Sequence, residues 1–395
     1  MQTETVRWAD RFPELGSGPL PAAPYTSSGQ FSRECDRIFS CHWLFVCRED
    51  DVPESGSYFV RDLPGIPASI VVTRSPDGHI RAFHNVCRHR GNRLADGQGR
   101  ARRLVCNYHG WTYAPDGTLI GVPDEDQFVG LDRSTCGLRP LPTECWQGFV
   151  FVNLDDAPAE SLDDFLGTLG DRISGFPYRE MQRVVRYRAE LATNWKTAMD
   201  IGREGYHIRF VHRGTVPDSH VGGDNPYAHL PYMDIFGPHA ANSLGVNPNH
   251  TPSPAESFVA RFAATVIQRG DSAEGQPACL NPGGAEFWGF DAYFFFPNFG
   301  LILGPNWFST DLFIPVTVDR TIWEQSFYAR PPRNAGERIS LEFSSVLTRD
   351  LVREDWAQVE RVQSGLRTGA IEQFNLSDQE LLVRHAYETV NKLTS

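Results

Sequence analysis

The stretches NVCRHRG at residues 85–91 and CNYHGWTY at residues 106–113 set the fold of the first third of the chain. Each stretch supplies one cysteine and one histidine, in the order C-x-H, then sixteen residues, then C-x-x-H. The four side chains are Cys87, His89, Cys106 and His109. Thiolates and imidazoles are both metal ligands, so the pattern predicts two loops that hold one inorganic centre between them.

Two kinds of centre use mixed cysteine and histidine ligands, namely zinc and a Rieske [2Fe–2S] cluster. A structural zinc site usually pairs like with like, with two nearby cysteines followed by two nearby histidines. Here each loop can present its thiolate to one iron and its imidazole to the other, as a Rieske cluster requires. The order of ligands therefore favours an electron-transferring cluster, and structural zinc is the alternative.

The composition is that of a globular protein, and the length is sufficient for two domains. The chain has 395 residues, of which 41% are hydrophobic and 22% charged. No run approaches the roughly 18 apolar residues of a membrane span, and residues 1–10 lack a leader pattern, so we expect a cytoplasmic protein. The net charge of −12 argues against nucleic acid as a partner.

The pattern of turns and apolar runs predicts three segments. Residues 1–40 form a lead-in with one short helix, which we expect to pack on the C-terminal domain. Residues 41–155 have short apolar runs broken by turn signals, including Pro-Asp-Gly at 76–78 and 115–117, and predict an all-β domain. Residues 156–395 predict an α+β domain. Its expected helices are 162–169 and 337–371, and its expected strands are 187–191, 292–296, 300–303, 311–316 and 321–330.

A second pair of histidines, His207 and His212, follows Asn-Trp-Lys at 194–196 on a segment expected to be helical over 193–212. Side chains five residues apart on a helix differ in direction by about 140°. They can converge on one ion only if the helix distorts or ends between them. A bare H-x₄-H is more often two unrelated histidines, but its position downstream of the first motif favours a second metal site.

These motifs resemble those of the α (terminal oxygenase) subunits of Rieske non-haem iron aromatic-ring-hydroxylating oxygenases. The resemblance covers most of the chain and is weakest over residues 1–40 and 213–290. It implies an α+β chain with an N-terminal all-β Rieske [2Fe–2S] domain and a helix-grip (START-like) catalytic domain built on an antiparallel sheet. The implied cofactors are the Rieske [2Fe–2S] cluster and a mononuclear Fe(II).

The resemblance also implies an iron-binding triad of two histidines and a carboxylate, which leaves positions open for dioxygen. His207 and His212 match the histidine pair. The stretch Arg-Glu-Asp-Trp at 353–356 matches the C-terminal helix of the family and makes Asp355 the third ligand, with Glu354 as the alternative. A carboxylate that merely pairs with a neighbouring arginine is the simpler interpretation of Asp355.

Glu204 stands where the family places an acidic bridge between the cluster of one subunit and the iron of the next. On that match Glu204 would face His109 of a neighbouring chain. Glu204 could equally serve by orienting His207 alone. The match departs at Ile201, where many relatives in the resembled family have Asn after an acidic residue, so this chain lacks that side-chain amide.

The resemblance implies an oxygenase that uses O₂ and external electrons to hydroxylate or dihydroxylate an apolar aromatic or alicyclic substrate. The alternatives are a monooxygenase or N-dealkylase of a carnitine-like or betaine-like amine and a non-enzymatic Rieske electron carrier. No G-x-G-x-x-G follows a strand, so a ferredoxin or flavin reductase is expected to supply the electrons. The implied assembly is a homotrimer, with or without β subunits.

One local charge pattern bears on the electron donor. Six arginines and one acid lie between residues 88 and 103. This basic patch could dock an acidic electron donor, or its arginines could buttress the cluster loops.

Overall fold

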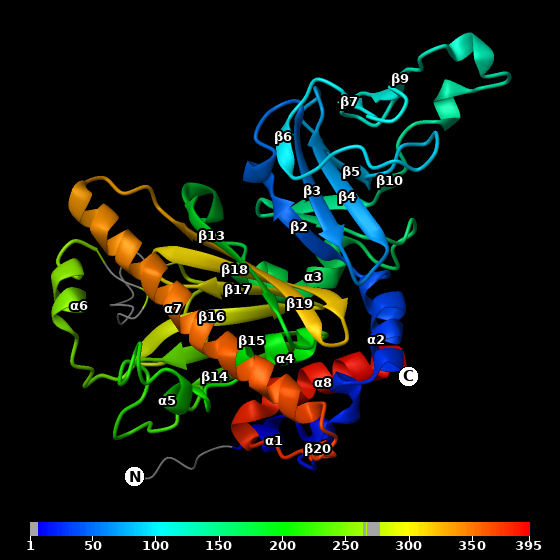
Figure 1. Cartoon of the computed structure of the whole chain (residues 1–395). Helices are drawn as coiled ribbons and strands as arrows, with labels where there is room; N and C mark the ends of the chain where they lie inside the picture. The colour runs from blue at the N-terminus through cyan, green and yellow to red at the C-terminus, as the bar shows by residue number, and fades with distance from the viewer. Residues whose placement is uncertain (1–6, 264–265, 267–276) are drawn as a thin grey trace. The chain divides into compact units, whose positions relative to one another are not determined.

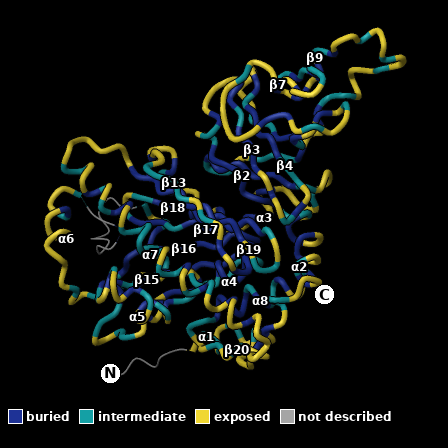
Figure 2. The backbone as a smooth tube through the Cα atoms, viewed as in Figure 1, coloured by how far each residue is buried: buried dark blue, intermediate teal, exposed yellow. Residues whose placement is uncertain are grey.

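The structure is a computed structural model that describes residues 7–263, 266 and 277–395 (Figure 1). It contains two compact units, one of residues Cys35–Phe165 and one that combines Met1–Glu34 with Leu166–Ser395. Most of the predicted lead-in therefore belongs to the second unit, and its residues 1–6 lie outside the described residues. In both units the sheet strands are largely buried, whereas the connecting loops carry most of the exposed residues (Figure 2).

The unit Cys35–Phe165 has a core of β-sheets, as predicted for residues 41–155, with helical residues at its two ends. Its antiparallel sheets have the strand orders β10-β5-β4-β3-β6, β11-β12-β2 and β7-β8-β9. The strands are β2 Leu44–Arg48, β3 Ser57–Leu63, β4 Ala68–Arg74, β5 Ile80–His84, β6 Gln98–Arg100, β7 Leu104–Val105, β8 Thr112–Tyr113, β9 Leu119–Gly121, β10 Pro140–Leu141, β11 Thr143–Trp146 and β12 Phe149–Val152. The last of the three sheets carries the second cysteine-histidine stretch between β7 and β8.

Both Pro-Asp-Gly sequences form the predicted turns. Gly78 closes the turn between β4 and β5 with a φ of 84°, and Gly117 closes the turn between β8 and β9 with a φ of 87°. A side chain at Gly117 would also overlap the ring of Phe83. These glycines satisfy a backbone conformation that other residues rarely adopt.

The second unit is built on one seven-stranded antiparallel sheet with the order β13-β19-β18-β17-β16-β15-β14. The strands are β13 Gln182–Leu191, β14 Tyr232–Phe236, β15 His239–Gly245, β16 Trp288–Phe295, β17 Phe299–Leu303, β18 Trp307–Thr317 and β19 Arg320–Ala329. A small ladder joins β1 Leu20–Pro21 to β20 Gln373–Phe374. All five predicted strands of this unit are confirmed, but β14 and β15 were not predicted.

A long helix, α7, packs on this sheet and gives the predicted helix-grip arrangement (Figure 1). The Asn334 side chain caps its start by accepting the N–H of Glu337 (2.9 Å), and the helix ends earlier than the predicted residue 371. The helices are α1 Trp8–Arg11, α2 Ser28–Glu34, α3 Leu162–Ile173, α4 Trp195–Asp200, α5 Ile208–Val211, α6 Pro254–Val259, α7 Ala335–Leu366 and α8 Leu381–Thr394. Among the described residues, no helix combines the length and the apolar character needed to cross a membrane.

The predicted helix over residues 193–212 forms only as separate helical pieces. Helix α4 ends at Asp200, a 3₁₀ turn follows at Ile201–Arg203, and Glu204 is extended with φ −142° and ψ 161°. Helix α5 is a single turn that begins after His207 and ends before His212. Glycine at position 205 permits this break, because Gly205 lies so close to the backbone of Ala228 that no Cβ fits there.

Candidate functional site

The two cysteine-histidine loops share one backbone design. In each, the cysteine N–H donates to the carbonyl five residues ahead, at 2.8 Å for both Cys87 and Cys106. Each cysteine carbonyl also accepts the N–H of the glycine four residues ahead, at 3.0 and 2.9 Å. These glycines, Gly91 and Gly110, have φ values of 76° and 73°. The repeated turn brings both cysteines inward and leaves both histidines at the outer end of the loops.

The four predicted ligand side chains come together in this unit. Cys87 and Cys106 are each 2% exposed, and the rings of His89 and His109 lie 4.6 Å apart between centroids. The Nδ1 atoms of both histidines are buried, and no described residue forms a hydrogen bond with them. Desolvation, together with His89 and Arg90, lowers the pKa of His109 and favours the neutral imidazole that binds a metal. Two thiols beside two unpartnered Nδ1 atoms fit a Rieske cluster.

Neighbouring groups hold these ligands in place. The ring of Trp111 stacks on His89, with centroids 5.0 Å apart and planes 9° apart. The hydroxyl of Tyr113 lies 3.4 Å from Sγ of Cys87 and accepts the N–H of Arg88 (3.0 Å). Hydrogen bonds to the sulfurs are one of the means by which a protein tunes the potential of an iron–sulfur cluster.

A second ligand set, His207, His212 and Asp355, lies in the other unit. One ligand atom from each residue lies within 4.8 Å of the others. Oδ1 of Asp355 is 3.1 Å from Nε2 of His212 and 3.6 Å from Nε2 of His207. Because α5 is only one turn long, the two histidines converge despite their five-residue spacing. Two imidazoles and one carboxylate on one side of an ion are the donor set of a mononuclear Fe(II) site.

Two further carboxylates orient these histidines. Oε1 of Glu204 is 2.6 Å from Nδ1 of His207, and Oε2 of Glu204 accepts the N–H of the same residue (3.1 Å). Oε2 of Glu354 is 2.9 Å from Nδ1 of His212. A carboxylate that accepts the Nδ1 proton leaves Nε2 free to bind a metal. In this geometry Asp355 faces the Nε2 atoms of both histidines, whereas Glu354 contacts Nδ1 of His212.

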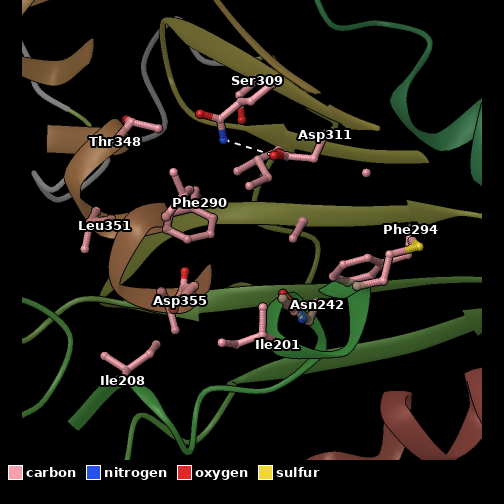
Figure 3. A pocket seen from close by; sticks show the side chains of 18 of the residues that line it. Ile201, Ile208, Asn242, Phe290, Phe294, Ser309, Asp311, Thr348, Leu351 and Asp355 are labelled. Carbon is pink, nitrogen blue, oxygen red and sulfur yellow. Dashed lines mark hydrogen bonds between the residues drawn. The ribbon is translucent and has the colours of Figure 1, made fainter. Parts of the chain in front are cut away.

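A cavity of about 210 Å³ opens beside the second ligand set. Its walls are mainly apolar and come from the sheet, α4 and α7, with aromatic side chains at Phe290, Trp307 and Phe313. Ile201, where the sequence departs from the motif that the resemblance implies, is part of the wall (Figure 3). Asp200, the preceding acid, instead pairs with Arg203 (3.0 Å) outside the cavity.

Several polar residues of this cavity were not predicted from the sequence. Nδ1 of His220 hydrogen-bonds the carbonyl of Gly245 (2.9 Å), and burial lowers the pKa of His220 to about 4, so its ring is neutral. Asp311, Asn242 and Gln325 also line the cavity. None belongs to a motif. Asp311 and Gln325 lie on predicted strands, whereas His220 and Asn242 lie in residues 213–290, for which no element was predicted.

Comparisons with known proteins agree with this arrangement. Residues 42–143 match the model of the Rieske [2Fe-2S] domain, and residues 178–395 match that of the ring hydroxylating alpha subunit (catalytic domain). The chain belongs to the ring-hydroxylating alpha subunit family. This family assignment confirms the predicted cofactors, a Rieske [2Fe–2S] cluster and a mononuclear iron, and makes a structural zinc in the loops the wrong alternative.

Several curated proteins are similar to this chain. The glycine betaine monooxygenase oxygenase subunit of Chromohalobacter salexigens is 34% identical over 56% of this chain and 49% of that protein. The carnitine monooxygenase oxygenase subunit of Acinetobacter pittii is 33% identical over 49% of this chain and 53% of that protein. The chain thus spans about half the length of the curated relatives that it matches.

Two solved structures share the fold of nearly the whole chain. A quaternary ammonium Rieske monooxygenase in complex with L-carnitine has a TM-score of 0.74 at 23% identity and covers 96% of both chains. Naphthalene 1,2-dioxygenase from Rhodococcus sp. bound to indole has a TM-score of 0.76 at 23% identity and covers 100% of this chain and 99% of that chain.

Proposed function

We propose that the chain is a terminal oxygenase that uses O₂ and externally supplied electrons to hydroxylate a small organic substrate. The observation that carries this proposal is the pairing of two ligand sets in one chain, the second of which borders an apolar cavity. An electron carrier needs only the first set. The convergence of His207, His212 and Asp355 therefore favours the oxygenase over the carrier.

The residues of the chain have distinct tasks in this proposal. When bound by His207, His212 and Asp355, Fe(II) supplies the binding and activation of dioxygen. Glu204 and Glu354 keep the two imidazoles in the metal-binding tautomer. The apolar walls hold the substrate next to the ligand set and exclude water. Converting one C–H to C–OH consumes one O₂, two electrons and two protons and releases one water.

Two substrate classes are candidates. The apolar walls and the fold shared with naphthalene 1,2-dioxygenase support the aromatic or alicyclic class that the sequence favoured. The glycine betaine and carnitine monooxygenases among the relatives support the amine class. The cavity also favours the amine class, because its described wall includes Glu204, Asp311 and Asp355 but no lysine or arginine. We place the amine first and aromatic hydrocarbon catabolism second.

We further propose that a ferredoxin or flavin reductase supplies the electrons. Of the six arginines between residues 88 and 103, Arg93 pairs with Asp62 (2.9 Å) and Arg100 pairs with Glu54 (2.8 Å). The other four, Arg88, Arg90, Arg102 and Arg103, are exposed and form no ion pair with any described residue. Such unpaired charge supports the docking of an acidic electron donor.

The assembly and the location of the protein also remain proposals. We propose a cytoplasmic homotrimer, with or without β subunits. In such a trimer Glu204 would bridge His207 to His109 of the next subunit, in addition to orienting His207.

Iron quantitation combined with O₂ uptake tests the proposed function. The wild-type protein is expected to contain about three irons per chain and to consume O₂ with a surrogate reductase and substrate. His207→Ala is expected to contain about two irons, to keep the visible spectrum of the cluster and to lose turnover. His229→Ala, in an exposed loop outside the cavity, is the matched control. A colourless, zinc-filled protein without a rhombic paramagnetic signal after dithionite reduction would refute the proposal.

A further inference from the structure

Asp311, on strand β18, is a carboxylate in the cavity wall that the proposed chemistry does not use. The residue is 8% exposed and faces the cavity together with Ser309 of the same strand (Figure 3). Asp355 enters the cavity from α7, a different wall (Figure 3). Asp311 is therefore part of the space that a substrate would fill, and it is not part of the ligand set.

The hydrogen bonds of Asp311 fix its position but satisfy only one of its oxygens. Oδ1 accepts the Nε2–H of Gln325 (3.0 Å) and the Nε1–H of Trp323 (2.8 Å). Gln325 lies directly opposite Asp311 in the β18–β19 register, which holds the two side chains together. No described residue donates a hydrogen bond to Oδ2. Oδ2 is not one of the fully buried side-chain atoms that lack a partner, so this free oxygen is accessible from the cavity.

The charges of the cavity wall indicate that Asp311 lacks a cationic partner among the described residues. Glu204 and Asp355, the other two acids of the wall, each contact a histidine of the ligand set. Both partners of Asp311, Trp323 and Gln325, are neutral. Burial raises the pKa of Asp311 to about 7, which reflects the cost of a carboxylate that has left water without gaining a cation. A positively charged ligand would remove that cost.

A second acceptor lies beside this carboxylate. Gln325 is 2% exposed, and its Oε1 is buried without a hydrogen-bond partner among the described residues. The amide cannot rotate to use this oxygen without giving up its bond to Asp311. An incoming group that carries both positive charge and a hydrogen-bond donor suits this end of the cavity better than a neutral or donor-free group.

We propose that Asp311 is the recognition group for a protonated amine substrate, whose N–H donates to Oδ2 while its apolar part lies along Phe290 and Trp307. This inference rests on the proposed function, since it names the substrate class of the same cavity. It differs from a preference for quaternary ammonium ions, because these have charge but no N–H. A binding measurement can therefore separate the two.

The experiment measures dissociation constants for the oxidised, iron-loaded protein without an electron donor. The probes are N,N-dimethylbenzylamine below its pKa, benzyltrimethylammonium, and isobutylbenzene as the neutral isostere of the first. The protonated amine is expected to bind wild-type protein at least tenfold more tightly than isobutylbenzene, because hydrogen bonds to charged groups are strong. Benzyltrimethylammonium is expected to bind less tightly than the protonated amine. Equal binding of amine and isostere, or tighter binding of the quaternary ion, would overturn the inference without any variant.

Two variants then test whether the preference for the protonated amine arises from Asp311. Asp311→Asn is expected to weaken binding of the protonated amine about tenfold or more and binding of isobutylbenzene less than twofold. The control Asp319→Asn removes a negative charge from the turn between the same two strands, outside the cavity, and is expected to leave both constants unchanged. Equal weakening of both probes by Asp311→Asn would mean that Asp311 only supports the wall, which overturns the inference.

The outcome is separable from that of the proposed function. The binding assay requires no turnover, so a protein that consumes no O₂ still tests the role of Asp311. Conversely, a protein that hydroxylates a neutral aromatic compound and shows no preference for amines would retain the proposed oxygenase function and lose this inference.

Discussion

Breaking the ion pair between Lys196 and Glu34 is the sharpest stability test that the structure offers. Lys196 lies in the first turn of α4, the element that leads to Glu204 and His207, and Glu34 ends α2 in the N-terminal segment. The Lys196 ammonium contacts Oε1 of Glu34, and the two side chains are 5% and 0% exposed. Oε2 of Glu34 accepts the Nε1–H of Trp195 (2.8 Å). This contact ties residues far apart in the sequence within one unit.

Lys196→Met leaves a carboxylate buried without its cation. Losing one partner of a buried ion pair costs about 3–5 kcal/mol. For a domain of this size each kcal/mol lowers Tm by about 2–4 °C, so the expected loss is about 6–20 °C. A chain of two units does not unfold in one step, so calorimetry of the iron-loaded chain is combined with the visible absorption of the cluster. The transition to be measured is the one during which this absorption persists.

Two further variants make this result decisive. Arg338→Met removes an exposed ion pair to Glu342, with side chains 73% and 63% exposed, and is expected to cost less than about 1 kcal/mol. The double change Glu34→Gln with Lys196→Met removes both charges and is expected to recover most of the lost stability. If Lys196→Met behaves like Arg338→Met, or if the double change is as harmful as Lys196→Met alone, the buried-charge explanation is wrong.

Local geometry supports three other predictions. Gly205→Ala places a Cβ against the carbonyl of Ala228 and is expected to remove most of the mononuclear iron while leaving the cluster spectrum intact; Gly223→Ala, where the space is open, should leave the iron content unchanged. Burial raises the pKa of Asp291 to about 6, above the value of about 3.9 for an unfolded chain, so the folded state binds more protons between these values. Stability should therefore fall by about 1–2 kcal/mol from pH 5 to 7 in urea titrations, and a fall of equal size in Asp291→Asn would contradict this. Tyr113→Phe removes a hydroxyl 3.4 Å from Sγ of Cys87 and should lower the cluster potential by about 20–60 mV in a redox titration, since one hydrogen bond is worth about 0.5–1.5 kcal/mol; an unchanged potential would mean that the hydroxyl does not donate to the sulfur.

Predictions from local patterns succeeded where the pattern itself causes the structure. The Pro-Asp-Gly turns formed because proline and glycine restrict the backbone at those positions, whatever surrounds them. The strands after residue 290 were predicted because their residues are largely apolar or β-branched.

Strand β15, His239–Gly245, shows where such patterns fail. It consists mainly of small and polar residues, yet all but its last residue are buried. Its polar side chains find partners inside the unit: Ser243 donates to Asp291 (2.6 Å), and Asn242 donates to the carbonyl of Gly202 (3.1 Å). Because these partners are about 40 or more residues away in the chain, the local pattern does not reveal that the segment is a buried strand.

The candidate site shows the same contrast between local sequence patterns and contacts between residues distant in the chain. The spacing of Cys87, His89, Cys106 and His109 was sufficient to predict one centre, because all four lie on two short loops. The second ligand set was harder to predict, since Asp355 follows His212 only after most of the sheet and Glu354 is its neighbour. Only the packing of α7 decides which of the two carboxylates faces the Nε2 atoms.

Residue types and their spacing were enough to predict the two cysteine-histidine loops, the two Pro-Asp-Gly turns, and the succession of an all-β domain and an α+β domain. Three features emerged only on folding: the break in the helix between Asp200 and His207, the choice of acid that joins the histidines, and the meeting of Asp311 with Gln325 in the cavity wall. The two groups of features differ in how far apart in the sequence their determining residues lie. Turn and ligand chemistry act between residues close in the chain, whereas burial, charge pairing and cavity shape depend on groups that only folding brings together.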